Sequence, residues 1–305
     1  MLAVTPVAAA AVLMVALAAV DADHDLILRL AGYTGGEMAS PHARRVAAPS
    51  APPAFNDRAQ AGVLLGAALR KAMGEAAIVH KEVHTERGRA LPATAPLPAD
   101  TQGGGPRVFA LPRGGVPVAA GVARALGATL DVLMVRKIGH PAAPELGLGA
   151  IAEDGLGGAA EPYFDEEMLA AVGLTKADLD AVVERERAEL ARRLVVYRRG
   201  SPGGAPGRDL AGQLVIVVDD GLATGVTARA ALRAVRARGA ARTVLAVPVG
   251  SPAAVEAIKK QTDEVVTLVT PRRFHSVGEW YVDFGQLTDT DVLTILSSGG
   301  TPAPA

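Results

Sequence analysis

Short apolar runs alternate with segments of helical spacing over the last two thirds of the chain. The runs that predict strands are residues 108–111, 130–135, 214–218, 244–249 and 264–269. The stretches that predict helices are residues 117–126 (closed by Gly127), 176–198, 227–238 and 253–260. Because strands joined by helices form a mainly parallel sheet covered on both faces, this order predicts a three-layer α/β/α domain. Ligands of such sheets bind outside the carboxyl ends of the strands.

Two further elements are predicted outside this alternation. Residues 61–69 place Ala and Leu at helical spacing, and Asn56 or Asp57 can cap that helix by accepting its free amide protons. Residues 149–161 predict a hairpin that turns around the glycines of residues 155–158.

The apolar pattern is lost toward both ends of the chain. Residues 1–53 therefore predict an N-terminal extension, residues 54–297 the domain and residues 298–305 a disordered tail. Residues 86–106 are rich in Pro, Gly and Ala and predict a flexible surface insertion in the domain.

The first twenty residues allow two interpretations. They carry no charged side chain, and a stretch of ~20 apolar residues is long enough to span a bilayer. They lack the preceding Lys or Arg of a signal peptide. A dispensable extension is favoured, and a membrane anchor or targeting segment stays open as the minority interpretation. We accordingly expect a cytoplasmic protein with no stable membrane association.

Charge and composition exclude several kinds of function. The net charge is −1, and no basic cluster exceeds two or three residues. A protein that contacts the DNA backbone broadly needs a basic face, so nucleic acid is not an expected partner. The chain has no cysteine, which excludes disulfides, thiolate metal sites and a cysteine nucleophile.

The segment with the clearest chemistry is the end of the strand over residues 214–218. This all-apolar strand ends in Asp219 and Asp220, and a turn of small residues then opens the helix over residues 227–238. Backbone N–H groups of such a turn, together with a helix N-terminus, suit a phosphate monoester. The two carboxylates lie nearby, where they can accept hydrogen bonds from ribose hydroxyls.

Three residues of the turn strengthen this interpretation. Gly225 lets the backbone approach an anion closely. Thr224 and Thr227 add hydroxyl donors on either side of it. An acidic pair after a strand is common by itself, and the combination with this turn is what points to a phosphorylated sugar.

The segment resembles the signature by which type I phosphoribosyltransferases bind phosphoribosyl pyrophosphate (PRPP). The resemblance implies that Asp219 and Asp220 contact the ribose 2- and 3-hydroxyls. The loop that it implies for the 5-phosphate consists of Ala223, Thr224, Gly225, Val226 and Thr227. Gly221 departs from the family pattern, which has an aliphatic residue there, and is expected to loosen the turn without removing a ligand.

Two more strand ends match elements of the same family. Arg113, Gly114 and Gly115 stand where the family has its pyrophosphate loop: the glycines expose backbone amides, and the guanidinium can hold a diphosphate with two bonds. Arg136 and Lys137 resemble the Arg-Lys element that enters the mobile catalytic loop of adenine and orotate phosphoribosyltransferases. The resemblance implies that both cations neutralise the leaving pyrophosphate.

The resemblance extends to a bacterial group of stand-alone phosphoribosyltransferase-like proteins. It covers about residues 55–73 and 107–297, and the extension and the insertion depart from it. The matching segments are residues 55–58, 144–153, 197–200 and 278–284.

Several residues near these motifs keep two interpretations. His140 is either a site residue or an ordinary loop residue, and Glu153 either approaches the site or is a surface acid of the hairpin. Aromatic residues make up only 3% of the chain, which draws attention to Phe274, Trp280 and Tyr281. They supply either a flat apolar face for a planar acceptor base or a small aromatic core.

The resemblance implies a transferase that displaces the pyrophosphate of PRPP with a nitrogen of a small acceptor, by family precedent a purine or related base. Mg²⁺ is the expected cofactor; it takes few protein ligands, so no dedicated cage is expected beyond a role of Asp219 and Asp220. The alternative is a non-catalytic PRPP or nucleotide regulator of the same fold. Retention of Arg113, Arg136 and Lys137 favours the enzyme. A homodimer stays open.

Overall fold

A parallel sheet organises the part of the chain that the structure describes. In this computed structural model the described residues are 53–74, 105–199 and 209–297. The sheet has five parallel strands in the order β2-β1-β6-β7-β8. Their bounds are β1 (Arg107–Ala110), β2 (Thr129–Val132), β6 (Leu214–Val218), β7 (Arg242–Val249) and β8 (Glu264–Val269).

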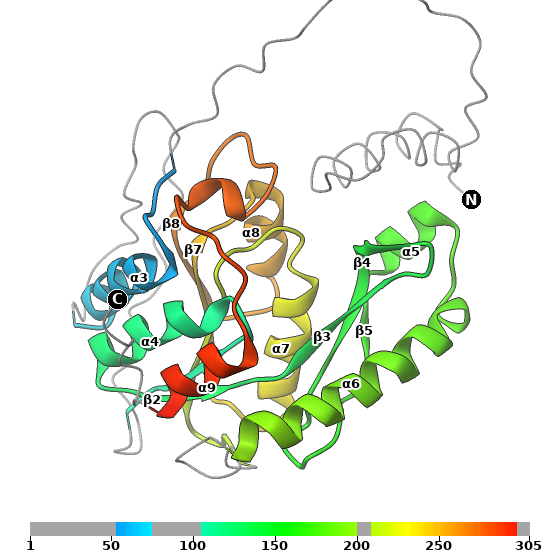
Figure 1. Cartoon of the computed structure of the whole chain (residues 1–305), viewed down its shortest axis with the longest axis horizontal. Coiled ribbons are helices and arrows are strands. Elements are labelled where there is room, and N and C mark those ends of the chain that lie inside the picture. Colours follow the sequence, from blue (N-terminus) through cyan, green and yellow to red (C-terminus); the bar gives the residue numbers. More distant parts are fainter. Residues whose placement is uncertain (1–52, 75–104, 200–208, 298–305) are drawn as a thin grey trace, which may run out of the picture.

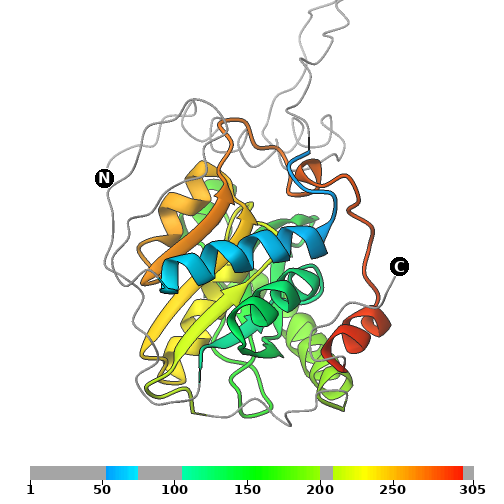
Figure 2. The same cartoon turned by 90° about the vertical axis from the view of Figure 1, so that its left-hand side faces the viewer.

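Helices cover both faces of this sheet (Figure 1). One face packs against α3 (Arg58–Gly74), α4 (Gly115–Leu126) and α9 (Asp289–Ser297), and Figure 2 shows α3 and α4 lying across it. The other face packs against α7 (Val226–Ala237) and α8 (Pro252–Ile258). The predicted three-layer α/β/α architecture with a mainly parallel sheet is therefore confirmed.

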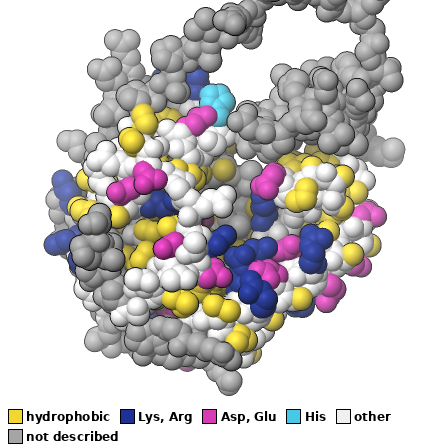
Figure 3. Space-filling view, viewed as in Figure 1, with side chains coloured by type: hydrophobic (Ala, Val, Ile, Leu, Met, Phe, Trp, Pro, Cys, Tyr) yellow, Lys and Arg dark blue, Asp and Glu magenta, His cyan; other side chains and the backbone are white. Residues whose placement is uncertain are grey.

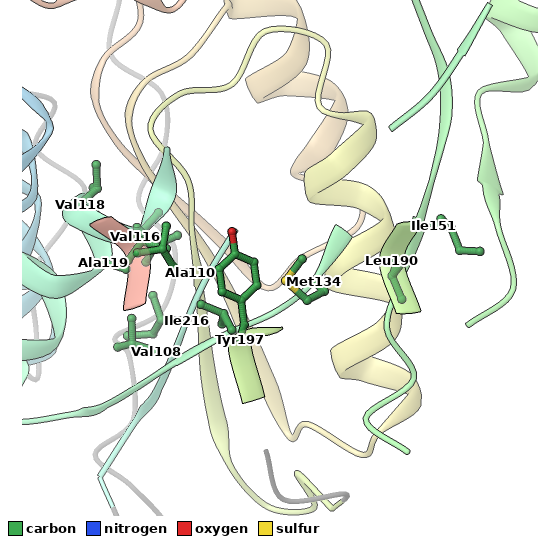
Figure 4. Close-up of a cluster of buried hydrophobic side chains, with 14 of the residues drawn as sticks. Val108, Ala110, Val116, Val118, Ala119, Met134, Ile151, Leu190, Tyr197 and Ile216 are labelled. Carbon is green, nitrogen blue, oxygen red and sulfur yellow. The ribbon is translucent and has the colours of Figure 1, made fainter. Parts of the chain in front are cut away.

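The central strand β6 is apolar throughout because it is buried from both sides. All five residues of β6 are buried. Val108 and Ile216 belong to the cluster under α3 and α4, whereas Phe109 and Val215 belong to the cluster under α7 and α8. Successive side chains of a strand point to opposite faces, so one short apolar run supplies both cores. Figure 4 shows part of the first cluster, in which Tyr197 and Leu190 of α6 (Asp180–Arg199) pack beside the strands.

A second, antiparallel sheet stands beside the first (Figure 1). It consists of β3 (Val135–His140), β4 (Ala143–Ala152) and β5 (Tyr163–Phe164). Two helices and a 3₁₀ turn follow β5, namely α5 (Glu166–Val172), η1 (Ala177–Leu179) and α6. The chain thus leaves the parallel sheet after β2 and returns to it at β6.

The start of α3 is fixed by its cap and its crossing with α4 by glycines. The Asp57 carboxylate accepts a hydrogen bond from the Gln60 N–H at 2.7 Å, which satisfies a free donor at the helix start. A Cβ atom added at Gly121 of α4 would lie 2.5 Å from the carbonyl carbon of Gly62 in α3. The two helices therefore touch through their backbones.

The segment before α3 is hydrogen-bonded to a segment near the end of the domain. Phe55 forms a parallel bridge with Tyr281, which follows the 3₁₀ turn η2 (Gly278–Trp280). The N–H of Phe55 donates to the Trp280 carbonyl at 3.0 Å, and the N–H of Val282 donates to the Phe55 carbonyl at 2.9 Å. Two segments more than two hundred residues apart are thereby held side by side.

Local element predictions succeeded except around the second sheet. The predicted strand over residues 130–135 is two strands, because β2 ends at Val132 and β3 begins at Val135 in another sheet. The predicted hairpin around residues 155–158 is present: β4 pairs antiparallel with β5 across this turn, and Glu153 bridges to Ala159 next to it. The main partner of β4 is β3. His140, for which an ordinary loop position was one of two interpretations, is the last residue of β3.

The predicted extension, tail and most of the predicted insertion lie outside the described residues. This includes residues 1–20, on which the membrane interpretation depends. Among the residues that the structure describes, no helix is long and apolar enough to cross a membrane.

Candidate functional site

Neighbouring strands of the parallel sheet deliver the predicted motifs to one edge. The last residues of β1 and β6, Ala110 and Val218, are register partners. The N–H of Leu111 donates to the Val218 carbonyl at 2.9 Å. The loop that starts at Leu111 and the loop that starts at Asp219 therefore leave the sheet side by side, at the carboxyl edge where such folds bind ligands.

The predicted phosphate loop leads directly into α7. Gly225 is the N-cap of α7 with φ 82°, and its position has no side-chain cap hydrogen bond. The positive φ is in the left-handed region that glycine adopts without a steric penalty. Because the first N–H groups of a helix have no partner within it, they remain available to an anion. Thr224 is exposed and Thr227 is half-buried, so both hydroxyls can reach a bound group.

The loop after β7 pins this phosphate loop in place. The Ser251 hydroxyl donates to the Ala223 carbonyl at 2.8 Å, and the Ser251 N–H donates to the Leu222 carbonyl at 2.8 Å. Leu222 in turn donates its N–H to the Val249 carbonyl at 2.9 Å. The loop conformation therefore exists before any ligand arrives.

Asp219 and Asp220 lie at the base of this loop in a largely desolvated position. Burial and the negative charge of Asp220 raise the pKa of Asp219 well above its ordinary value. Burial also raises the pKa of Asp220, and the guanidinium of Arg58 opposes that rise. The Arg58 Nε–Asp220 Oδ2 distance is 2.8 Å. The site thus concentrates negative charge where water is scarce.

The predicted pyrophosphate loop packs directly on the two carboxylates. A Cβ atom added at Gly114 would lie 1.9 Å from Asp220 Oδ2. A Cβ atom added at Gly115 would lie 2.6 Å from the Val218 carbonyl oxygen. Only glycine fits at these positions. Arg113 lies on the outer side of the loop, with its guanidinium 3.8 Å from Asp289 Oδ1 and its side chain 38% exposed.

The structure separates the two predicted cations of β3, because neighbouring residues of a strand point to opposite faces. Arg136 turns toward α6 and donates two hydrogen bonds to Glu186 Oε2, at 3.0 and 2.7 Å. The stem of Lys137 lies on the side of the phosphate loop: a Cβ atom added at Gly147 would lie 3.1 Å from both Lys137 Cδ and Val226 Cγ2. Lys137, rather than Arg136, is therefore oriented toward the candidate site.

Glu153 has a structural position. Its side chain is buried, and its Oε1 atom accepts a hydrogen bond from the Met134 N–H at 3.1 Å. It closes the base of the hairpin between β3 and β4. The interpretation of Glu153 as an exposed hairpin acid is thus wrong, because its carboxylate is buried and accepts a backbone hydrogen bond.

The C-terminal aromatic residues form a core. Phe55, Trp280 and Tyr281 are buried in one cluster, and Phe274 packs against it. The Tyr281 hydroxyl donates to the Asp220 backbone carbonyl at 2.6 Å. The rings of Trp280 and Tyr281 are covered by neighbours, so the structure favours the core interpretation for these two. Phe274 is half-buried and keeps a partly open face.

This arrangement of a Gly-capped phosphate loop, an acidic pair and a glycine loop agrees with the comparison with known families. The model of the phosphoribosyl transferase domain matches residues 100–284. The chain belongs to the phosphoribosyl transferase family.

Relatives and a solved structure support the same assignment. A Mycobacterium tuberculosis protein named "Putative phosphoribosyl transferase Rv0571c" is 43% identical over 214 residues, which cover 69% of this chain and 46% of that protein. Its counterpart MT0597 from a second strain matches equally. The chain thus spans about half the length of these relatives. The crystal structure of TT1426 from Thermus thermophilus is 39% identical with a TM-score of 0.58, covering 80% of this chain and 98% of that one.

Three residues of this candidate site were missed from the sequence. Arg58 contacts Asp220, Ser251 holds the phosphate loop, and Val277 covers Gly221. Ser251 had a readable signal, since it is the N-cap of a helix with Pro252 at its first turn, directly after a strand. Arg58 and Val277 reach the site only through tertiary packing.

The contact between Val277 and Gly221 yields a stability prediction. A Cβ atom at Gly221 would lie 2.5 Å from Val277 Cγ1, so Gly221→Ala should lower the free energy of unfolding by about 1–3 kcal/mol through overpacking. Val277→Ala removes the colliding methyl groups and should restore part of that loss in the double variant. Thermal unfolding of the four proteins measures the coupling. Strictly additive losses would show that Gly221 serves another purpose.

The raised pKa of Asp219 yields a second prediction. Because the folded pKa exceeds the unfolded one, the ionised carboxylate destabilises the fold at neutral pH, and the penalty disappears as pH falls through the folded pKa. Asp219→Asn should therefore raise Tm at pH 7.5, by roughly 2–4 °C for each kcal/mol relieved. The difference from wild type should shrink on acidification. The measurement is thermal unfolding between pH 8 and 5, with chelator and without ligand.

Asp220→Asn is the matched control for that experiment. The pKa of Asp220 is raised as well, but Asp220→Asn also removes the counter-charge of the largely buried Arg58 side chain. The two effects oppose each other, so Asp220→Asn should raise Tm less than Asp219→Asn does, or lower it. Equal stabilisation by both substitutions, or a lower Tm for Asp219→Asn at pH 7.5, would contradict the assigned electrostatics.

Proposed function

We propose that this chain binds PRPP together with Mg²⁺ and transfers the ribose 5-phosphate group to a nitrogen of a small acceptor base, releasing pyrophosphate. The observation that carries the proposal is the meeting of three elements at one sheet edge. They are the N-terminus of α7 at Gly225, the carboxylates of Asp219 and Asp220, and the Gly114–Gly115 backbone that touches them. Phosphate, ribose and pyrophosphate are the three parts of PRPP, and each has a complementary element.

The proposed chemistry forms one bond and breaks another at ribose C1. The C1–oxygen bond to pyrophosphate breaks, and pyrophosphate leaves with the electron pair. The acceptor nitrogen forms the new bond to C1 with its lone pair and releases its proton to solvent. The transition state carries positive charge on the sugar and added negative charge on the leaving group. The protein contributes mainly positioning and fixed charge, with the carboxylates on the ribose side and the cations on the pyrophosphate side.

The donor set fits Mg²⁺ as a cofactor shared with the substrate. Within the described ranges no group of three or more His, Cys, Asp or Glu side chains is placed to hold a metal ion alone. Asp219 and Asp220 supply carboxylate oxygens, and Mg²⁺ usually takes one or two carboxylates and completes its shell with substrate phosphate and water. When bound, the ion would balance the charge of the pyrophosphate.

A regulator that binds PRPP without turning it over is the second candidate. The observation that favours it is the ion pair of Arg136 with Glu186. This pair directs Arg136 away from the site, although the sequence had suggested a catalytic role for both Arg136 and Lys137. Lys137 remains on the site side and is 37% exposed.

The two functions differ in turnover. Purified protein with PRPP and Mg²⁺ should release pyrophosphate when the correct base is present, and a panel of purines, pyrimidines and small amines identifies it. The expected result is acceptor-dependent release that ceases when Mg²⁺ is chelated. Tight PRPP binding with no release across the panel would support the regulator, and no PRPP binding would overturn both functions.

Lys137 yields the most specific prediction for ligand binding. Lys137→Ala should leave ribose 5-phosphate affinity within about twofold and weaken PRPP about tenfold, because a bond to a charged group contributes roughly 1.5–3 kcal/mol. Lys259→Ala is the matched control, because Lys259, the C-cap of α8, forms a Lys–Glu pair of similar exposure with Glu256. Calorimetry with both ligands tests the pair. Equal loss of both ligands would place Lys137 outside the pyrophosphate region.

Arg136→Ala should act on stability instead. It leaves the Glu186 carboxylate, 11% exposed, without its strongest partner, and breaking such a pair is destabilising. Tm should fall while the ribose 5-phosphate affinity of the folded protein is retained. A wild-type Tm combined with a selective loss of PRPP affinity would contradict this role and show that Arg136 contacts the pyrophosphate.

A further inference from the structure

The carboxylate of Asp220 is bound to a cation that the protein itself supplies. Arg58, at the first position of α3, donates from Nε to Asp220 Oδ2 at 2.8 Å. Both side chains are largely buried, at 12% and 16% exposure. A hydrogen bond between two charged groups that are partly removed from water is stronger than a surface ion pair.

Arg58 is itself held from two further directions. Its NH1 atom donates to the Gly285 carbonyl at 2.9 Å, and its guanidinium lies 3.7 Å from the centre of the Phe284 ring, within the range of a cation–π contact. Phe284 packs against Tyr281, with ring centres 5.1 Å apart. The guanidinium therefore has fixed neighbours, unlike a mobile surface arginine.

Asp220 is confined on its other sides as well. The Tyr281 hydroxyl donates to the Asp220 carbonyl at 2.6 Å, which fixes the backbone from which the carboxylate extends. Gly114 lies so close that a Cβ atom there would be 1.9 Å from Asp220 Oδ2. The carboxylate is thus enclosed between the pyrophosphate loop and the guanidinium.

The other cations near the site lie in looser contacts. Arg113 is 3.8 Å from Asp289 and 38% exposed. Lys137 is 37% exposed, and its Nζ atom donates to the carbonyl and to Oε2 of the exposed Glu145, at 3.0 and 3.3 Å. Such exposed pairs are weak, so these two cations are free to move to an arriving pyrophosphate. Arg58 has the opposite character, since it is close, buried and held by three groups.

We propose that Arg58 is a positioning residue of the ribose site, which fixes the Asp220 carboxylate beside Asp219 in the orientation that receives the ribose hydroxyls. The proposal rests on the proposed function. Arg58 acts through Asp220 and does not touch the ligand. Two adjacent carboxylates repel each other, and the guanidinium holds one of them against that repulsion before the ligand arrives.

This role explains two segments that the function had left unused. Residues 55–58 and residues 278–284 match the stand-alone phosphoribosyltransferase-like proteins but carry none of the phosphate or pyrophosphate contacts. In the structure they pair through Phe55 and Tyr281. Together they bring Arg58, Phe284 and the Tyr281 hydroxyl around Asp220. Together the two segments fix the position of the Asp220 carboxylate.

A double-mutant cycle on ligand affinity tests the proposal. The variants are Arg58→Met, which keeps an unbranched stem against Phe284, Asp220→Asn, and both together. Calorimetry with ribose 5-phosphate should give about tenfold weaker binding for each single variant, as expected for a lost bond to a charged group. The double variant should bind within about twofold of Asp220→Asn, because a residue that acts only through Asp220 has no further effect.

Two more variants separate positioning from folding. Arg58→Lys keeps the charge and should bind ribose 5-phosphate within about threefold of wild type. It retains the ion pair with Asp220 but lacks the planar guanidinium that also reaches the Gly285 carbonyl. If Arg58→Met does not fold, the same cycle is run with Arg58→Gln, which keeps a polar side chain but removes the charge. Arg242→Met removes a part-buried arginine paired with Glu264 at the opposite edge of the sheet, and should leave affinity unchanged.

The outcomes distinguish failure of the inference from failure of the proposed function. If wild type binds ribose 5-phosphate and the two single losses multiply in the double variant, Arg58 does not act through Asp220 and the inference is wrong. The same conclusion follows if Arg58→Met binds like wild type. If wild type binds neither ribose 5-phosphate nor PRPP, the proposed function fails, and the inference fails with it.

Discussion

The constraint on which the site depends is the burial of two adjacent carboxylates at the end of an apolar strand. β6 is buried along its whole length, and it ends directly in Asp219 and Asp220. Burial raises the pKa of both side chains, so their charges are unfavourable unless something compensates them. The surroundings supply partial compensation: a guanidinium reaches Asp220, and the N-terminus of α7 begins a few residues away. What remains uncompensated is what a ligand with hydroxyls and an accompanying cation would satisfy.

The same constraint explains the distribution of glycine and of cations around the site. Gly114 and Gly115 lie against Asp220 and Val218 because nothing larger fits, and Gly221 lies under Val277 for the same reason. The basic side chains of Arg113 and Lys137 lie farther out, in exposed pairs with acidic residues. Figure 3 shows Lys and Arg side chains near the middle of the face that Figure 1 views, mixed with Asp and Glu. A mixed surface of this kind agrees with a small anionic substrate, which needs a few placed cations rather than an extended basic face.

The sequence predicted the parts of the site that are local and missed the parts that are tertiary. β6, the acidic pair and the loop before α7 are contiguous, so the pattern of apolar, acidic and small residues was sufficient to find them. The break between β2 and β3 was missed because residues 132–135 form one continuous apolar run, although the chain changes sheets within it. The separation of Arg136 from Lys137 followed from strand alternation, but only once that segment was known to be a strand. Arg58 lay in a segment that matched the related bacterial proteins, but its contact with Asp220 could not be read from the sequence, because the two residues are 162 positions apart.

The central claim is that the loop before α7 and the acidic pair together hold a ribose 5-phosphate group. A crystal structure of the protein with ribose 5-phosphate bound tests this most directly. The account predicts the phosphate at the backbone N–H groups of residues 223–227, with Thr224 or Thr227 as a donor, and the ribose hydroxyls within hydrogen-bond distance of Asp219 and Asp220. A phosphate bound elsewhere, or bound there with the sugar pointing away from both carboxylates, would contradict it.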